Sequence, residues 1–146
     1  MTTFRIFSVV GYILMVLALV PLIYFQGLFS WSPLVIAVQT LAVGLMVWAR
    51  ITFGLRSFHY AANPTEGGLV TTGPYRFIRH PIYAAIVYFT LAGVAGNWSW
   101  RNVALFGVVC LGAAIRIFCE ERLVVIDYPG YSEYAKRTKR IVPFVF

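Results

Sequence analysis

The fold of this chain is decided by the stretch FRIFSVVGYILMVLALVPLIYF, residues 4–25, which carries no charged side chain after Arg5. A helix needs about 20 apolar residues to cross a hydrocarbon core of about 30 Å, and this stretch is long enough. Pro21 lies close to its end, where a membrane helix tolerates a kink. The stretch is too long for the core of a cleaved signal peptide and lacks a clear small-residue cleavage site. We therefore predict a transmembrane helix that is retained.

Three further apolar segments follow, and the composition agrees with them. Hydrophobic residues make up 60% of the 146 residues and charged residues 12%, whereas soluble domains are about 45–50% apolar and about 25% charged. We predict one domain over residues 1–146, an all-α integral membrane bundle of about four transmembrane helices with a cytoplasmic loop and a C-terminal interfacial segment. The helices are expected at about 4–25, 33–53, 81–100 and 101–120.

The basic residues indicate the orientation of the bundle. The connection at 26–32 has none, whereas the connection at 54–79 has Arg56, Arg76 and Arg79, and the tail is basic as well. Basic residues accumulate on the cytoplasmic side, so both termini and the long connection are predicted to be cytoplasmic. The tight connection between the third and fourth segments predicts an antiparallel hairpin.

The net charge of +7 is typical of a membrane protein whose basic residues lie beside its membrane-spanning segments. The basic residues flank apolar segments, so we expect contact with membrane lipids and no binding of nucleic acid. No metal site is expected either, because His59, His80 and the acidic pair at 120–121 match no standard zinc spacing. His59 and Tyr60 begin the long connection, where a lone histidine is more often structural than catalytic.

The first polar cluster is GPYRFIRHPIY, residues 73–83. Pro81 suits the first position of a helix, because its missing N–H group costs nothing there. His80 would then be the capping residue, and the free N–H groups beside Arg79 would form an anion site. The alternative is a charged membrane flank with a proline helix start.

The second polar cluster is RIFCEER, residues 116–122. Arg116 and Glu120 are four residues apart and share one helix face. An unpaired charge at this depth is costly, so Arg116 is either a functional residue or one half of a structural pair with Glu120. Glu121 points about 100° away and is expected only to flank the helix.

These two clusters carry a family resemblance. The RHP-x-Y element in GPYRFIRHPIY, the paired glutamates one hairpin later, and a tail with tyrosines, an arginine and a final VPF together resemble the isoprenylcysteine carboxyl methyltransferase family. The related phospholipid N-methyltransferases share this outline. The resemblance covers about residues 67–144. Ala85 departs from the glycine that is usual there, and the Gly67-Gly68 pair stands where eukaryotic members carry a histidine.

The resemblance implies a membrane enzyme that binds S-adenosylmethionine at its cytoplasmic face. Arg116 would be the catalytic, substrate-side arginine, and Glu120 would hold a polar end of the cofactor. The other residues implied in cofactor binding are Leu69, Val70, Tyr75, His80, Pro81, Ile82 and Tyr83.

The expected function is methylation of a lipophilic small-molecule or lipidated acceptor, most like a prenylated cysteine carboxylate. N-methylation of a phospholipid amine is the alternative, but an arginine beside the nucleophile disfavours it because the amine must be neutral. A non-catalytic transport or assembly subunit is a third interpretation. A transporter would place polar residues near the bilayer midplane, where Gln39 and Thr40 are almost the only ones. These two side chains are expected to bond to a neighbouring helix.

Overall fold

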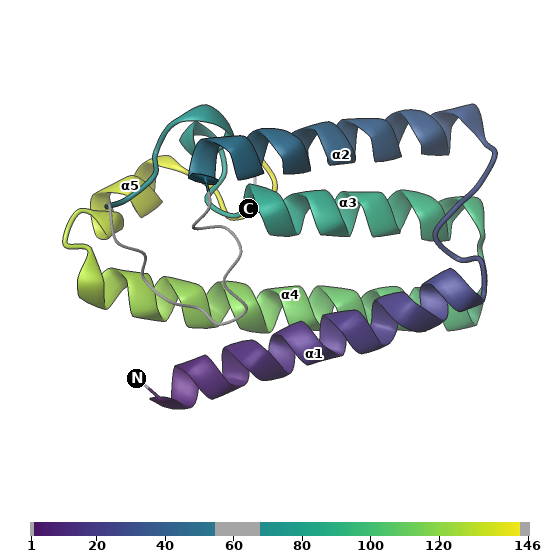
Figure 1. Ribbon diagram of the computed structural model, residues 1–146, viewed down its shortest axis with the longest axis horizontal. Helices are drawn as coiled ribbons and strands as arrows, with labels where there is room; N and C mark the ends of the chain where they lie inside the picture. Colours follow the sequence, from purple (N-terminus) through teal and green to yellow (C-terminus); the bar gives the residue numbers. More distant parts are fainter. Residues whose placement is uncertain (1, 55–67, 144–146) are drawn as a thin grey trace.

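The computed structural model describes residues 2–54 and 68–143, and the regular structure of these residues is helical. These residues form four long helices and two short ones, and Figure 1 shows the long helices side by side in a bundle. Their bounds are α1 Thr2–Tyr24, α2 Pro33–Phe53, the 3-10 helix η2 Gly73–Arg76, α3 Pro81–Gly96, α4 Trp100–Asp127 and α5 Tyr131–Arg137. The all-α prediction is therefore confirmed. The predicted candidates His59 and Tyr60 lie outside the described residues.

Three of the helices, α1, α2 and α4, are long and apolar enough to cross a membrane. The fourth apolar helix, α3, has 16 residues and a length of about 24 Å, so it is shorter than the others. It nevertheless lies alongside them in the bundle (Figure 1). The four predicted apolar segments are thus all helices, and the chain is a membrane protein by its helices and their composition.

The predicted ends of the third and fourth helices were wrong. α3 stops at Gly96 rather than at 100, and the Asn97 side-chain amide donates to the carbonyl of Gly93 at 3.1 Å. α4 begins at Trp100, where the Ser99 side chain accepts from the Asn102 N–H at 3.2 Å. It continues to Asp127, because charge ends an apolar segment without ending a helix, and Leu123 is still fully packed.

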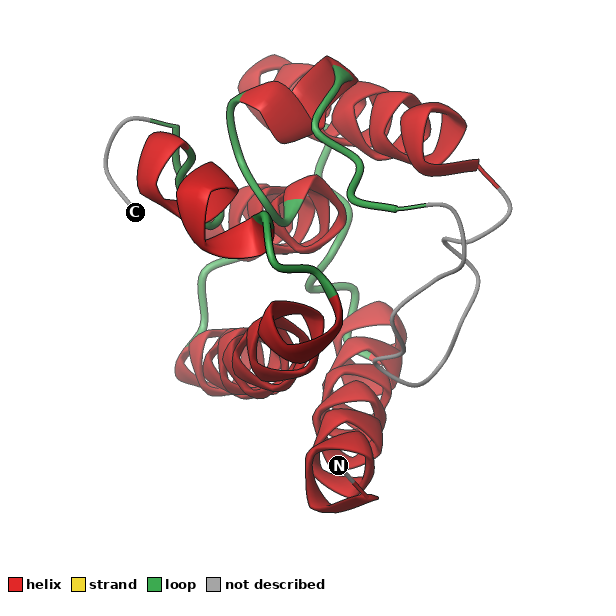
Figure 2. Cartoon of the chain, turned by 90° about the vertical axis from the view of Figure 1, so that its left-hand side faces the viewer, coloured by secondary structure: helices red, strands yellow, loops and turns green. Residues whose placement is uncertain are grey.

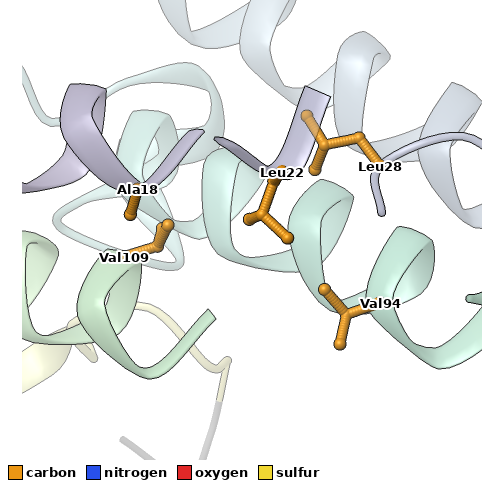
Figure 3. Close-up of a cluster of buried hydrophobic side chains, with 5 residues drawn as sticks. All are labelled: Ala18, Leu22, Leu28, Val94 and Val109. Carbon is orange, nitrogen blue, oxygen red and sulfur yellow. The ribbon is translucent and has the colours of Figure 1, made fainter. Parts of the chain in front are cut away.

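The helices are arranged as two pairs. α1 packs mainly along α4 and α2 mainly along α3, while α3 and α4 touch over a smaller area. The end-on view in Figure 2 shows these two pairs stacked on each other. α3 and α4 run in opposite directions, as the predicted hairpin requires (Figure 1). A core cluster joins the two pairs: Ala18, Leu22, Leu28, Val94 and Val109 (Figure 3).

Towards the end of the bundle that holds the 26–32 connection, the side-chain amide of Gln39 joins neighbouring segments. Gln39 donates to the Leu28 carbonyl at 2.6 Å and to the Phe89 carbonyl at 3.3 Å. These bonds confirm the prediction that Gln39 joins neighbouring segments. The same prediction was wrong for Thr40, whose hydroxyl donates to Ile36 of its own helix at 2.8 Å. Such i−4 bonds satisfy a hydroxyl inside a helix without any partner helix.

The opposite end collects the polar residues. The start of α1, the end of α2, the start of α3, the end of α4 and α5 all lie there (Figure 1). Because α3 begins where α4 ends, the two polar clusters of the sequence meet. The candidate site is at this end.

Candidate active site

Three side chains from α3 and α4 form a compact polar group, here called the Arg116 cluster: Tyr83, Arg116 and Glu120. Arg116 Nε donates to the Tyr83 hydroxyl oxygen at 2.6 Å, and Arg116 Nη2 donates to Glu120 Oε1 at 3.2 Å. The Tyr83 hydroxyl in turn donates to the same Glu120 oxygen. Arg116 is only 5% exposed, so these partners compensate a charge that would otherwise be very costly.

Helix α1 closes the third side of Arg116. The main-chain oxygen of Ser8 accepts from Arg116 Nη1 at 3.3 Å. The guanidinium carbon also lies 5.6 Å from the centre of the Tyr12 ring and 5.7 Å from that of Tyr83, both within cation–π range. Among the described residues, the buried Ser8 hydroxyl has no hydrogen-bond partner.

A second group, here called the Glu121 cluster, consists of Arg79, His80, Glu121 and Arg140. Glu121 Oε1 accepts from Arg79 Nε at 3.0 Å and lies 3.3 Å from His80 Nε2. Glu121 Oε2 accepts from Arg140 Nε at 3.1 Å and from Nη2 at 3.0 Å. The prediction that Glu121 only flanks the helix was wrong. Its rotation about α4 points it towards the tail, where three cationic or protonatable groups meet it.

The tail is fastened to the segment that precedes α3. Ile78 and Lys139 form a parallel bridge, and the N–H groups of Arg79 and His80 donate to the carbonyls of Lys139 and Arg140 at 2.7 and 2.9 Å. Arg79 Nη1 also donates to the carbonyls of Ala135, at 2.8 Å, and Thr138. Arg79 is therefore directed at Glu121 and the tail rather than at the start of α3, where it was expected to serve an anion site.

Two tail tyrosines face the protein. The Tyr134 hydroxyl donates to the Tyr75 carbonyl at 2.6 Å, and Tyr131 is buried. Burial raises the pKa of Tyr134 to about 12, and burial, reinforced by the nearby Glu121 charge, raises the pKa of Tyr131 further. Both side chains are thus neutral phenols at physiological pH. The tail predicted as interfacial packs its aromatic side chains inward.

The segment before α3 holds the other predicted cofactor residues. His80 is the N-cap residue of α3 and Pro81 its first residue, so the predicted helix start is confirmed. Tyr75 of η2 is buried, with its ring 5.5 Å from that of Phe53, and burial is the main cause that raises the pKa of its hydroxyl. Gly73 has φ 58°, and a side chain there would meet Thr52 at 2.5 Å.

The predicted residues thus fall into two sets. His80, Tyr83, Arg116 and Glu120 meet in or beside the Arg116 cluster, since His80 Nδ1 lies 3.7 Å from Glu120 Oε2. Leu69, Val70 and Tyr75 lie on the approach to α3, where Leu69 and Val70 are half-buried; Pro81 is buried and Ile82 half-buried in the first turn. Sequence reasoning missed the roles of Glu121, Arg140, Ser8 and Tyr12. Arg140 belongs to the tail pattern that was noticed, whereas the hydropathy of α1 does not tell which helix it packs against.

The two glutamates differ in how their oxygens are used. Both Glu121 oxygens accept from arginine. Glu120 Oε1 is shared by Tyr83 and Arg116, whereas Oε2 lies 3.7 Å from His80 Nδ1. The Glu120 side chain is also more exposed, 24% against 15%. Glu120 therefore offers a carboxylate oxygen to a donor that arrives from outside.

Residues 2–54 and 68–143 hold no group of three or more His, Cys, Asp or Glu side chains arranged for a metal ion.

The curated proteins similar to this chain include two that are named for resistance to metals. The chain is 31% identical over 120 residues to the cobalt-zinc-cadmium resistance protein CzcN of Cupriavidus metallidurans, and this alignment covers 78% of the chain. It is 28% identical over 134 residues to the nickel-cobalt-cadmium resistance protein NccN of Alcaligenes xylosoxydans xylosoxydans, which covers 88% of it. The aligned parts span 52% and 61% of the lengths of these relatives. No solved structure matches the chain.

The family model of the phospholipid methyltransferases matches residues 28–129. This stretch contains α2, α3, α4 and both glutamates, and it begins after α1. The resemblance inferred from the two polar clusters is confirmed at the level of the family. The chain belongs to the phospholipid methyltransferase family.

Proposed function

We propose that this protein transfers a methyl group from S-adenosylmethionine to a lipophilic acceptor at the cytoplasmic face of a prokaryotic cell membrane. The observation that carries the proposal is the Arg116 cluster, a hydrogen-bonded arginine, tyrosine and glutamate at one end of an apolar bundle. The membership of the chain in the phospholipid methyltransferase family supports methyl transfer as the type of reaction.

The residues at this end suit the cofactor. S-adenosylmethionine has an ammonium group and ribose hydroxyls, which need carboxylate or other oxygen acceptors, and Glu120 Oε2 is such an acceptor. The half-buried Leu69, Val70 and Ile82 offer apolar surface on the approach to α3 and in its first turn. His80 and Pro81 would contact the cofactor, with Tyr75 and Tyr83. When bound, the cofactor supplies an electrophilic methyl group on a sulfonium sulfur.

Arg116 favours an anionic acceptor. A carboxylate is already ionised at neutral pH and needs no general base. The guanidinium is fixed from three sides by Tyr83, Glu120 and Ser8, so it presents a positive charge in a defined direction. It would hold and orient the acceptor, and such orientation is the main help that this reaction needs. An isoprenylcysteine-type carboxylate fits this requirement.

A second candidate is N-methylation of a phospholipid amine, which the description of the matching family favours. Glu120 would then take up the proton that an ammonium group must lose before it reacts. Arg116 opposes this reaction, because a cationic headgroup is repelled by the guanidinium. The two reactions leave chemically different products.

The test is a methyl-transfer assay on the purified protein with radiolabelled S-adenosylmethionine. Acceptors are a farnesylcysteine analogue, phosphatidylethanolamine, and membranes of the source cells. A methyl ester releases volatile methanol in alkali, whereas an N-methyl group does not. Alkali-labile label supports the carboxylate acceptor, and alkali-stable lipid label supports the amine.

The membrane fraction is prepared from cells grown with and without cobalt, nickel and cadmium, because two relatives are named for resistance to such metals. Arg116→Ala is the negative control, and the exposed Glu133→Gln is the matched control for a lost carboxylate. No label above the Arg116→Ala background with any acceptor would reject the proposal.

A further inference from the structure

Helix α1 lies before the stretch that the family model matches, yet it contributes to the candidate site. It is the main packing partner of α4, the helix that carries Arg116 and Glu120. Figure 1 shows the two helices side by side along most of their length. Residues of α1 are therefore placed to act on the Arg116 cluster without being part of the family's shared motif.

The two helices approach most closely at a pair of glycines near Arg116. A methyl group added at Gly11 would lie 2.8 Å from the Gly112 carbonyl oxygen and 3.1 Å from Arg116 Cγ. A methyl group added at Gly112 would lie 2.6 Å from the Gly11 carbonyl oxygen. Real side chains do not accept such distances without a shift, so the glycines fix how near α1 comes to the stem of Arg116.

This close approach brings two further groups of α1 to the guanidinium. The Ser8 main-chain oxygen accepts from Nη1 at 3.3 Å, and the Tyr12 ring centre lies 5.6 Å from the guanidinium carbon. Tyr12 is 46% exposed, so its ring is not needed to fill the core. The stem, one nitrogen and one face of Arg116 are thus all set by α1, while α3 and α4 supply Tyr83 and Glu120.

We propose that α1 fixes the direction of the Arg116 guanidinium, and that Gly11 and Tyr12 are positioning residues for the methyl acceptor. This inference rests on the proposed function for the identity of the reaction. It deepens that function by assigning acceptor positioning to a helix outside the matched family stretch. The cofactor, held on the side of Glu120 and His80, depends on α1 much less.

The test compares Gly11→Ala with Gly107→Ala, which adds the same methyl group to α4 at a position where nothing lies within 4 Å. It also compares Tyr12→Leu with Tyr12→Phe, which keeps the ring. We expect Gly11→Ala and Tyr12→Leu to lower kcat/KM for the acceptor by a factor on the order of ten to a hundred, because small misplacements of a positioned group have such effects. Binding of S-adenosylhomocysteine should change much less than turnover, because both substitutions leave Glu120 and His80 in place. Tyr12→Phe should recover most of the turnover lost in Tyr12→Leu, and Gly107→Ala should behave as wild type.

A second readout does not depend on activity. In protein labelled with 15N-arginine, the Arg116 Nε–H signal, assigned by its loss in Arg116→Lys, reports on the guanidinium itself. We expect this signal to shift and exchange faster in Gly11→Ala and Tyr12→Leu but not in Gly107→Ala. An Arg116 signal and an acceptor kcat/KM that both variants leave unchanged would overturn the inference. So would a loss of cofactor binding as large as the loss of turnover. If even the wild type transfers no methyl group, the proposed function fails, whereas the arginine signal still decides whether α1 orients Arg116.

Discussion

Glu120 and Glu121 are neighbours on α4, yet they belong to two regions that differ in construction. Glu121 has both oxygens bound by arginines from the α3 approach and the tail. Glu120 has one oxygen bound by Arg116 and Tyr83, while the other lies 3.7 Å from His80. A half-buried carboxylate whose two oxygens are both bound can fasten segments together but has nothing left for a ligand. The Glu121 cluster therefore holds the structure, and the Arg116 cluster is where a ligand can be received.

The largest expected effect is on the reaction side. Arg116→Ala should lower methyl transfer on the order of a thousandfold, because a fixed charge that stabilises reacting groups is worth this much. Binding of S-adenosylhomocysteine should be largely spared, since Glu120 and His80 remain. The measurement pairs turnover with calorimetric binding. Turnover that survives in Arg116→Ala would place the reaction elsewhere and remove the distinction between the two clusters.

The second effect should fall on stability. Glu121→Ala leaves Arg79, which is only 9% exposed, without its carboxylate, and breaking such a pair costs about 3 kcal/mol. The free energy of unfolding in mild detergent should fall accordingly. Hydrogen exchange at the N–H groups of Arg79 and His80, which are bonded to the tail, should speed up first. If Glu121→Ala keeps full stability and a protected tail, the Glu121 cluster does not fasten the tail.

A smaller effect is expected when one hydroxyl group is removed from each of the two regions. Tyr134→Phe removes the bond to the Tyr75 carbonyl and should lower stability by about 1 kcal/mol. Tyr83→Phe removes the hydroxyl shared by Arg116 and Glu120 and should lower turnover more than stability. Thermal unfolding and methyl transfer are measured on both variants. If Tyr134→Phe and Tyr83→Phe lowered stability equally and also lowered turnover equally, the two clusters would act as one unit.

The smallest effect belongs to a surface pair. Glu133 and Lys136 of α5 lie 2.6 Å apart, but their side chains are 65% and 71% exposed. Exposed pairs contribute about 0–1 kcal/mol, so Glu133→Gln should change stability by less than about 0.5 kcal/mol. Measuring the unfolding of Glu133→Gln beside that of Glu121→Ala compares a solvent-exposed carboxylate with a half-buried one that is bound by arginines. A loss as large as that of Glu121→Ala would show that burial does not explain the difference.

Much of the fold could be predicted from the sequence, since four apolar segments, Pro33 and Pro81 at helix starts, and a glycine-rich connection are local signals. The ends of α3 and α4 could not be predicted. Asn97 ends α3 through a side-chain bond that hydropathy does not show, and α4 continues beyond its apolar stretch to Asp127. Glu121 was misjudged for a related reason. Its direction around α4 was predicted, but its partner Arg140 comes from a tail whose docking depends on tertiary contacts.

The pairing of helices was equally hidden. A short connection predicted that α3 and α4 are antiparallel, but the closest packing joins α1 to α4 and α2 to α3. Inside a membrane every helix has apolar faces all round, so hydropathy carries no information on which face meets which helix. The small residues Gly11 and Gly112 were the available signal for the α1–α4 contact. The contribution of α1 to the site followed only from that contact.

The most direct test of the central claim is calorimetric titration of S-adenosylhomocysteine into the detergent-solubilised protein, with Glu120→Ala, His80→Ala and Glu133→Gln beside it. We predict saturable binding that Glu120→Ala and His80→Ala weaken on the order of tenfold, which corresponds to the loss of one charged hydrogen bond, and that Glu133→Gln leaves unchanged. No binding to folded wild-type protein, or binding that Glu120→Ala does not weaken, would contradict the assignment of Glu120 and the Arg116 cluster to a methyltransferase site.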